Sequence, residues 1–181
     1  MEGVPVGKAR RCGFCQEAGH SKQTCPQNPK KSQTADFLRG LWSAARQGSK
    51  TKVLQLLADG AKIEERGGTE GSSPLQTASH HGFEGVVGVL LEHGADAAAK
   101  DNDGDTSMHV AARHGRTAVV QQLLHNFSLR YRKVSTQLSA KDNAGRTALH
   151  AAAHAYRGQT TVMQLLLDSG AETSPPDNAG N

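Results

Sequence analysis

Hydrophobic residues recur along this chain in four similar clusters, each of which ends in consecutive leucines. The clusters close at Leu57, Leu91, Leu124 and Leu167, so the first two intervals are 34 and 33 residues and the last is 43. A period of 33 residues is the length of one β-turn plus two antiparallel helices. The pattern therefore predicts a repeated helix-turn-helix unit, in which each Val/Leu cluster forms the second helix and fills the layer between neighbouring units.

A second pattern precedes these clusters and predicts the first helix of each pair. Three segments, 73–78, 106–112 and 147–152, share one pattern: a hydroxyl residue followed by apolar residues and alanines. Residues 41–46 are a degenerate copy of this frame. His109 and His150 occupy one position of this frame, where we expect the imidazole to hydrogen-bond to neighbouring backbone. Glycine supplies the left-handed conformation that a helix end needs. It follows the first helices at Gly48, Gly82, Gly115 and Gly158.

Composition and charge indicate that a small separate module precedes the repeats at the N-terminus. The chain has 181 residues, a formal net charge of +4 and 4% aromatic residues, which suits one domain of stacked helices plus a small module. The net charge lies in residues 1–34, since residues 35–181 are balanced. Residues 1–31 form a basic segment without hydrophobic periodicity, 32–35 form a short linker, and the repeats begin at residue 36. No uncharged apolar run approaches 18 residues, so the sequence predicts no transmembrane helix.

The three cysteines lie together in the basic segment and form a candidate metal site. Cys12, Cys15, His20 and Cys25 have the spacing C-x2-C-x4-H-x4-C. An odd number of cysteines argues against a disulfide scaffold and favours a metal site in a reducing compartment. Three thiolates and one imidazole supply the tetrahedral set that Zn²⁺ prefers, and this closed set leaves no position for a substrate. The spacing therefore predicts a structural zinc, whose binding would fold residues 12–25.

The repeats from residue 36 to 181 resemble the ankyrin repeat family. The resemblance implies an all-α solenoid of helix-turn-helix pairs with β-hairpin loops. Its repeats fall at about 36–69, 70–102, 103–143 and 144–178, with the start of a fifth at 179. In this family, hairpin tips and the ends of first helices build a concave protein-binding face. By analogy, the protein-binding candidates are Glu70, His80, His81, Asn102, Asp103, Asp105, Arg113, His114 and Arg146.

Two insertions depart from the regular repeat. In the third copy Phe127 stands where the terminal glycine is expected, and about eight extra residues follow within Ser128 to Gln137. The fourth copy carries two extra residues around His154 to Arg157 in its first-helix turn. We expect both insertions to bulge as loops without breaking the stack.

The end of the sequence repeats an earlier loop. Residues 177–181 copy 142–146, the hairpin that opens the fourth repeat, so the sequence stops where a fifth repeat would begin. A terminal repeat normally has a polar outer face. We therefore expect this chain to be the N-terminal piece of a longer protein, or a truncated product. We also expect the apolar face of Val162, Leu166 and Leu167 to be left exposed.

Residues 12–25 resemble the zinc knuckle family, including the Gly19-His20 pair and the Cys25-Pro26 that follows. The resemblance implies binding to single-stranded RNA or DNA, with a base stacked on an aromatic ring and basic side chains on phosphate. The corresponding candidates are Phe14, Lys8, Arg10, Arg11 and Lys22. Some knuckles bind proteins instead, and the charge pattern favours nucleic acid over protein.

Catalytic motifs are missing from the sequence. There is no Gly-x-Ser-x-Gly elbow and no cysteine outside the candidate zinc set. His150 and His154 have helical metal-binding spacing, but no glutamate follows His150 as a zinc protease requires. We therefore predict a non-enzyme: an intracellular, monomeric zinc-binding adaptor of cytoplasm or nucleus, without membrane attachment. Its ankyrin repeats would bind a protein and its knuckle would bind nucleic acid weakly. The alternative is a purely protein-directed scaffold whose knuckle contacts protein.

Overall fold

The computed structural model describes residues 40–130, 134–155, 159–173, 177–178 and 180. Residues 40–46 are helical, and each later helix contains a leucine cluster or most of a segment of the shared frame, apart from the region after Phe127. The helices are α2 (Lys50–Ala58), α3 (Pro74–His81), α4 (Glu84–Glu92), α5 (Ser107–Arg113), α6 (Thr117–Arg130), α7 (Val134–Leu138), α8 (Ala148–Ala153) and α9 (Thr160–Asp168).

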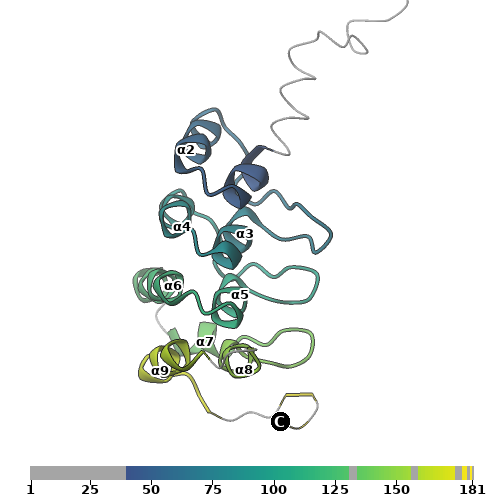
Figure 1. Cartoon of the computed structure of the whole chain (residues 1–181), viewed down its shortest axis with the longest axis vertical. Coiled ribbons are helices and arrows are strands. Elements are labelled where there is room, and N and C mark those ends of the chain that lie inside the picture. The colour runs from purple at the N-terminus through teal and green to yellow at the C-terminus, as the bar shows by residue number, and fades with distance from the viewer. Residues whose placement is uncertain (1–39, 131–133, 156–158, 174–176, 179, 181) are drawn as a thin grey trace, which may run out of the picture. The chain divides into compact units, whose positions relative to one another are not determined.

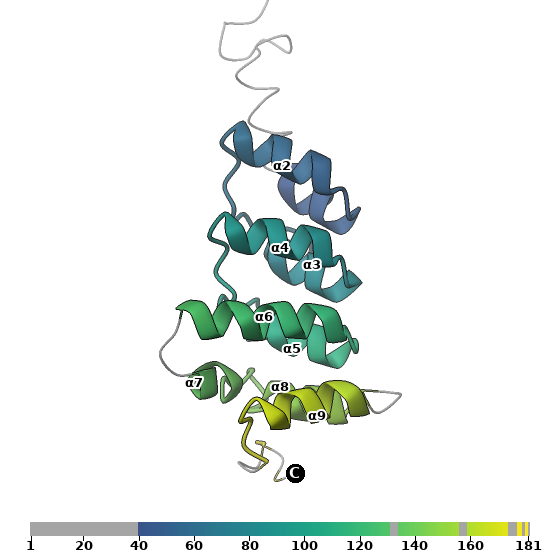
Figure 2. The same ribbon diagram turned by 90° about the vertical axis from the view of Figure 1, so that its left-hand side faces the viewer.

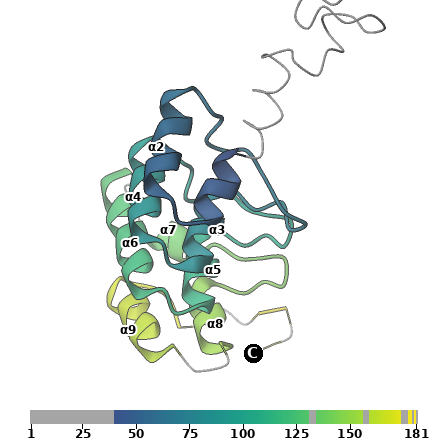
Figure 3. The same ribbon diagram turned by 45° about the horizontal axis from the view of Figure 1, so that its top comes forward.

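The helices form two layers of a stack, which confirms the all-α repeat architecture (Figure 1). The first helices, which are residues 40–46, α3, α5 and α8, form one layer. The second helices, α2, α4, α6 and α9, form the other layer (Figure 2). Each helix packs against its counterpart in the next repeat, as α3 does against α5 and α5 against α8. The long loops that join one repeat to the next project on the side of the first helices (Figure 3).

The first helices begin at capping boxes, in which a hydroxyl side chain and the third helical residue satisfy each other's backbone amides. In α3 the Ser73 hydroxyl accepts from the Gln76 amide at 3.2 Å, and the Gln76 carboxamide accepts from the Ser73 amide at 2.7 Å. Thr106 with His109, and Thr147 with His150, repeat this arrangement. The shared frame of the first helices is therefore a capping signal, and its histidines are capping residues.

The glycines after the first helices have the predicted left-handed conformation. Gly82 ends α3 with φ of 80°, and its amide donates to the Ala78 and Ser79 carbonyls. Gly115 has φ of 63° at the equivalent place after α5. Gly48 has φ of 69° after the first helix, and the predicted Gly158 lies outside the described residues. At these positions a side chain would be strained, so glycine is required for the reversal between paired helices.

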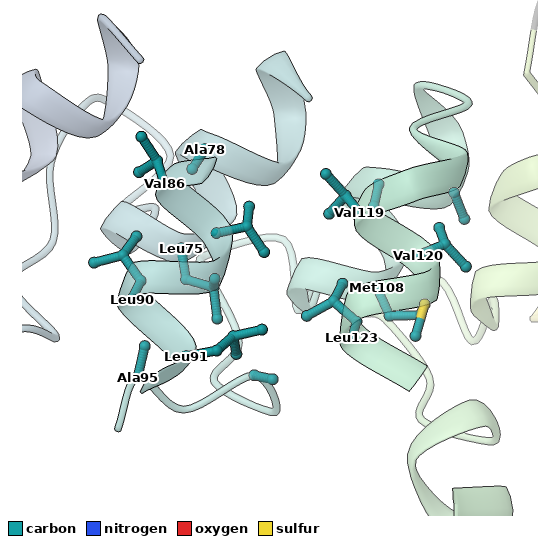
Figure 4. Close-up of a cluster of buried hydrophobic side chains, with 14 of the residues drawn as sticks. Leu75, Ala78, Val86, Leu90, Leu91, Ala95, Met108, Val119, Val120 and Leu123 are labelled. Carbon is teal, nitrogen blue, oxygen red and sulfur yellow. The ribbon is translucent and has the colours of Figure 1, made fainter. Parts of the chain in front are cut away.

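Small and branched apolar side chains fill the space between the helices (Figure 4). Leu75 and Ala78 of α3 are buried with the valine and leucine side chains of α4, and Met108 of α5 is buried with those of α6. The core continues through the stack rather than forming one centre. The Val/Leu clusters therefore form the interior layer that the repeat pattern predicts.

The described residues of the first insertion are helical, so the expected loop was wrong for them. Helix α6 continues through Phe127 to Arg130, and Val134–Leu138 form a further helix, α7. Phe127 is 1% exposed and Leu138 is also buried. Without a glycine to reverse the chain, α6 extends by a turn and buries an aromatic ring. Of the second insertion, His154 caps the end of α8, and residues 156–158 lie outside the described residues.

The loops between repeats are linked to one another by hydrogen bonds. Within the described residues one β-bridge is formed, between Gly67 and Ser72. The later loops are closed by turn hydrogen bonds instead, such as Asp101 N–H to the Asp105 carbonyl at 3.0 Å. Three asparagine carboxamides donate to the preceding loop: Asn102 to Thr69, Asn143 to Asn102 and Asn178 to Asn143, at 3.4, 2.9 and 3.3 Å. We call this series the asparagine ladder. Its hydrogen bonds connect successive loops along the loop side of the stack, which we call the loop edge.

The apolar face of the last helix is mostly covered, which corrects a second expectation. Val162 is 1% exposed and Leu166 is 0% exposed, so both were wrongly expected to lie open. Helix α9 contacts α8 and α6, and these contacts cover the two side chains. Leu167 is half-buried. The exposed part of this face is therefore smaller than the sequence pattern indicated.

Candidate functional site

A groove of about 500 Å³ lies between the first helices and the loops of the first three repeats. We call its two sides the helix wall and the loop wall. The helix wall includes Trp42, Arg46, Thr77, His80, His81, Val110, Arg113 and His114. The loop wall includes Gly67, Gly68, Thr69, Glu70, Asp101, Asp103 and Asp105. This is the face on which the predicted protein-binding residues were expected to meet.

Three histidines are clustered on the helix wall. The ring of His80 lies 4.1 Å from that of His114 and 4.7 Å from that of His81, between ring centroids. Burial, together with the neighbouring His81 and Arg116, lowers the pKa of His80. Burial, followed by the charge of His80, lowers the pKa of His114 to about 4. At neutral pH these two imidazoles are therefore uncharged, and they offer ring surface and hydrogen bonds rather than positive charge.

Asp105 and Arg113 form an ion pair at the base of the groove. The Arg113 guanidinium lies 2.6 and 2.9 Å from the two carboxylate oxygens of Asp105. Asp105 is 3% exposed, and its carbonyl accepts from the Gln76 carboxamide at 2.6 Å. Asp105 is thus a structural residue that positions Arg113 and is not free to contact a partner. Arg113 keeps an exposed edge, but its charge is balanced within the chain.

The remaining predicted contacts are divided between the groove and the loop edge. Glu70 and Asp103 are exposed and line the loop wall. Asn102 is exposed but belongs to the asparagine ladder, outside the groove lining. Arg146 also lies outside that lining, and its guanidinium pairs with Asp142 at 2.8 Å. Burial opposes ionisation of Asp142, but hydrogen bonds from Arg146 outweigh it and lower the pKa of this carboxyl.

Sequence reasoning missed Trp42 and Arg46, which close the groove at the first repeat. The Trp42 ring lies against the backbone of Gly67, where an added Cβ would come within 2.5 Å of it. The Arg46 guanidinium lies 5.5 Å from the centre of the Trp42 ring, in cation–π geometry. The available signal was the single tryptophan of the chain, together with the Gly67-Gly68 pair that makes room for it.

The predicted zinc and nucleic-acid residues are all in the N-terminal segment and lie outside the described residues: Lys8, Arg10, Arg11, Cys12, Phe14, Cys15, His20, Lys22 and Cys25. In the part of the chain that the structure describes, no group of three or more His, Cys, Asp or Glu side chains is placed to hold a metal ion. Among the same residues, every helix is too short or too polar to cross a bilayer.

Comparisons with known proteins match most of the stack. A family profile described as ankyrin repeats (3 copies) matches residues 41–137, and one described as ankyrin repeat matches residues 144–178. The chain is 40% identical over 87 residues to the E3 ubiquitin-protein ligase XBAT33 of Arabidopsis thaliana, covering 46% of this chain and 17% of the relative. It is 29% identical over 128 residues to the palmitoyltransferase AKR1 of Lachancea kluyveri, covering 71% and 17%.

A further relative is the ankyrin repeat and KH domain-containing protein CBG24701 of Caenorhabditis briggsae. The chain is 38% identical to it over 140 residues, which cover 75% of this chain and 5% of the relative. The chain thus spans less than a fifth of the length of these relatives. The family profile covers more than half of the chain, and the helix pairs, capping boxes and left-handed glycines agree with it. The chain belongs to the ankyrin repeat family.

Proposed function

We propose that this chain is an adaptor that binds a protein partner in the groove between its first helices and its loops. Ankyrin repeats imply protein–protein interaction, and stacked repeats use extended concave surfaces for this purpose. The observation that supports the groove as the binding site is its lining. Uncharged His80 and His114, the exposed Glu70 and Asp103, and the Trp42 ring face one open space of about 500 Å³.

A pair of bulky substitutions tests the groove. Thr69→Trp would place a bulky side chain on the loop wall and so fill the groove. Thr51→Trp adds the same bulk to an exposed position of α2 outside the groove lining. Each full-length variant would be immobilised and the proteins retained from a cell extract compared. We expect the partners of the wild type to be lost with Thr69→Trp and kept with Thr51→Trp. Identical retention by both variants would contradict binding in the groove.

The adaptor is proposed to have no catalytic activity. The sequence has no Gly-x-Ser-x-Gly elbow and no cysteine outside the candidate zinc set. The ligase and palmitoyltransferase activities in the names of two relatives belong to those proteins, of which this chain spans 17%. We place the adaptor inside the cell, in cytoplasm or nucleus, because its candidate zinc thiolates need a reducing compartment.

The N-terminal segment is proposed to bind zinc. The support is the C-x2-C-x4-H-x4-C spacing of Cys12, Cys15, His20 and Cys25, which supplies a closed tetrahedral set. Metal analysis of the purified full-length chain tests this. We expect one zinc per chain, and we expect Cys25→Ser to release it while the helical circular dichroism of the stack is unchanged. Full zinc content in the variant would exclude this ligand set.

The same segment is proposed to bind single-stranded RNA or DNA weakly. The support is Phe14 inside the candidate knuckle and the cluster of Lys8, Arg10, Arg11 and Lys22 around it. Stacking of a base on Phe14 would contribute about 1–3 kcal/mol, so Phe14→Ala should weaken binding without releasing zinc. Arg10→Gln with Arg11→Gln should flatten the salt dependence, and Lys52→Gln with Lys62→Gln is the charge-matched control. If none of these changes alters affinity for a labelled single strand, the alternative of a knuckle that contacts protein is favoured.

A further inference from the structure

The loop wall of the groove presents two exposed carboxylates, Glu70 and Asp103. Among the described residues, neither side chain takes part in an ion pair. A third carboxylate, Asp101, serves the loop itself, because its Oδ1 accepts from the amides of Asp103 and Asp105 at 3.0 and 2.9 Å. Arg66, from the same loop as Glu70, is directed to the Gly71 carbonyl at 3.1 Å rather than to a carboxylate. The loop wall is therefore acidic toward the groove.

The helix wall does not balance this charge. Arg113 is paired with Asp105 at 2.6 Å, so it contributes no net charge. His80 and His114 are uncharged at neutral pH because burial lowers the pKa of each. Two arginines line the groove, Arg46 and Arg113, and of these Arg46 has no carboxylate partner among the described residues. Negative charge exceeds positive charge in the groove, although the chain as a whole has a formal charge of +4.

The end of the groove at the first repeat already holds a cation on an aromatic ring. Arg46 lies over Trp42 at 5.5 Å from the ring centre. The ring is fixed from another side by Gly67 and Gly68, whose lack of side chains lets the loop lie against it. A guanidinium or ammonium group from a ligand would find the same ring face when Arg46 moves aside, since Arg46 itself is exposed.

We propose that the groove binds an extended, basic peptide segment of a protein partner, with Lys or Arg side chains directed to Glu70, Asp103 and the Trp42 ring. This rests on the proposed function of the groove and adds the chemical class of its occupant. A volume of about 500 Å³ accommodates a short stretch of extended chain rather than a folded surface. The opposite charges of the groove and the peptide would steer their association and make it sensitive to salt.

Selection from a random linear peptide library, displayed against the full-length chain, tests this proposal. Binding of each selected peptide would be measured again with a groove-filled variant, Thr69→Trp, to identify those that need the groove. We expect groove-dependent peptides to be enriched in Lys and Arg. A labelled peptide from this set should bind Glu70→Gln/Asp103→Asn at least fivefold more weakly than the wild type. The charge-matched control is Asp59→Asn/Glu92→Gln, at exposed positions outside the groove, and it should bind normally.

The outcomes distinguish failure of the proposed basic occupant from failure of the proposed binding groove. Groove-dependent peptides that are acidic or apolar, or that bind equally to Glu70→Gln/Asp103→Asn, would overturn the basic occupant and leave the proposed protein-binding groove standing. A library that yields no groove-dependent peptide would count against both. Equal weakening by the two charge-matched double variants would show a general charge effect and would also overturn the proposal. Circular dichroism of each variant establishes that the stack remains folded.

Discussion

At the scale of single residues, His109 connects two repeats. Its Nδ1 accepts from the Thr106 amide at 3.3 Å, which closes the capping box of α5. This assigns the proton to Nε2, which donates to the Arg146 carbonyl in the next loop at 3.0 Å. The imidazole is therefore buried with both nitrogens bonded. His150 repeats the capping bond but is only half-buried.

His109→Ala should reduce the free energy of unfolding by about 2–4 kcal/mol, because it leaves a cavity and removes partners from the Thr106 and Arg146 backbone groups. The matched change His150→Ala should cost less, since that side chain is less buried. Urea unfolding followed by circular dichroism measures both. Equal losses would mean that the bond to Arg146 contributes little.

Stability should also fall between pH 7 and pH 5. In the folded chain the pKa of His80, His109 and His114 is lowered, with burial as the largest cause in each case, whereas unfolded histidine titrates near 6.5. As pH falls below about 6.5, the unfolded chain takes up protons that the folded chain does not, so unfolding is favoured. The urea midpoint should be lower at pH 5, and His114→Gln should reduce the difference. A midpoint that rises at pH 5 would contradict these shifts.

At the scale of elements, the end of α6 shows how a helix replaces a loop. Phe127 lies where a glycine would end the repeat, and the helix continues until Arg130, whose guanidinium donates to the Leu91 carbonyl at 3.1 Å. The added turn is therefore anchored by a buried ring and by a bond to the preceding repeat. Leu129, on the same turn, is 72% exposed.

Phe127→Ala should cost about 3–5 kcal/mol, because it empties a fully buried site that backbone movement is unable to fill completely. Leu129→Ala is the control on the same turn and should stay within about 0.5 kcal/mol of the wild type. Both values come from urea unfolding of the full-length chain. Similar effects of the two changes would mean that the turn is not packed against the stack.

The helix pairs were predictable because their signals are local. Leucine clusters, capping residues and terminal glycines each act within a few residues, so one sequence was enough to place α3, α4 and α5. Whether the insertion after Phe127 forms a helix or a loop depends on the side chains that the extra turn packs against, and no local sequence pattern indicates them. Trp42 was missed for the same reason, because its contact with Gly67 spans 25 positions of a degenerate first repeat. The Asp105–Arg113 pair joins residues eight positions apart, beyond helical pair spacing.

At the scale of the whole stack, burial at one leucine position differs between the second and the fourth repeat. Leu91 of α4 is buried within the core, whereas Leu167 of α9, at the equivalent position, is half-buried. In a stack where each repeat contacts only its neighbours, stability is the sum of repeat and interface contributions. The fourth repeat is therefore expected to open before the second.

Leu91→Ala should cost about 2–5 kcal/mol, and Leu167→Ala should fall below that range because its site is already open to solvent. Hydrogen exchange of the wild type should show weaker protection in α9 than in α4. Equal protection of the two helices, or a larger loss from Leu167→Ala, would indicate that the outer face of the fourth repeat is covered in solution.

The asparagine ladder has a mechanical consequence. Its bonds run from loop to loop along the stack, and hydrogen bonds weaken steeply when they are stretched or tilted. The apolar contacts between the helices are non-directional, so a small shear between helices costs less than an equal stretch of a hydrogen bond. Tension along the stack would then leave the loop edge at nearly constant length while the helical layers spread. A pull on the ends would therefore bend the molecule toward its loops, and force applied by an attached partner would change the width of the groove.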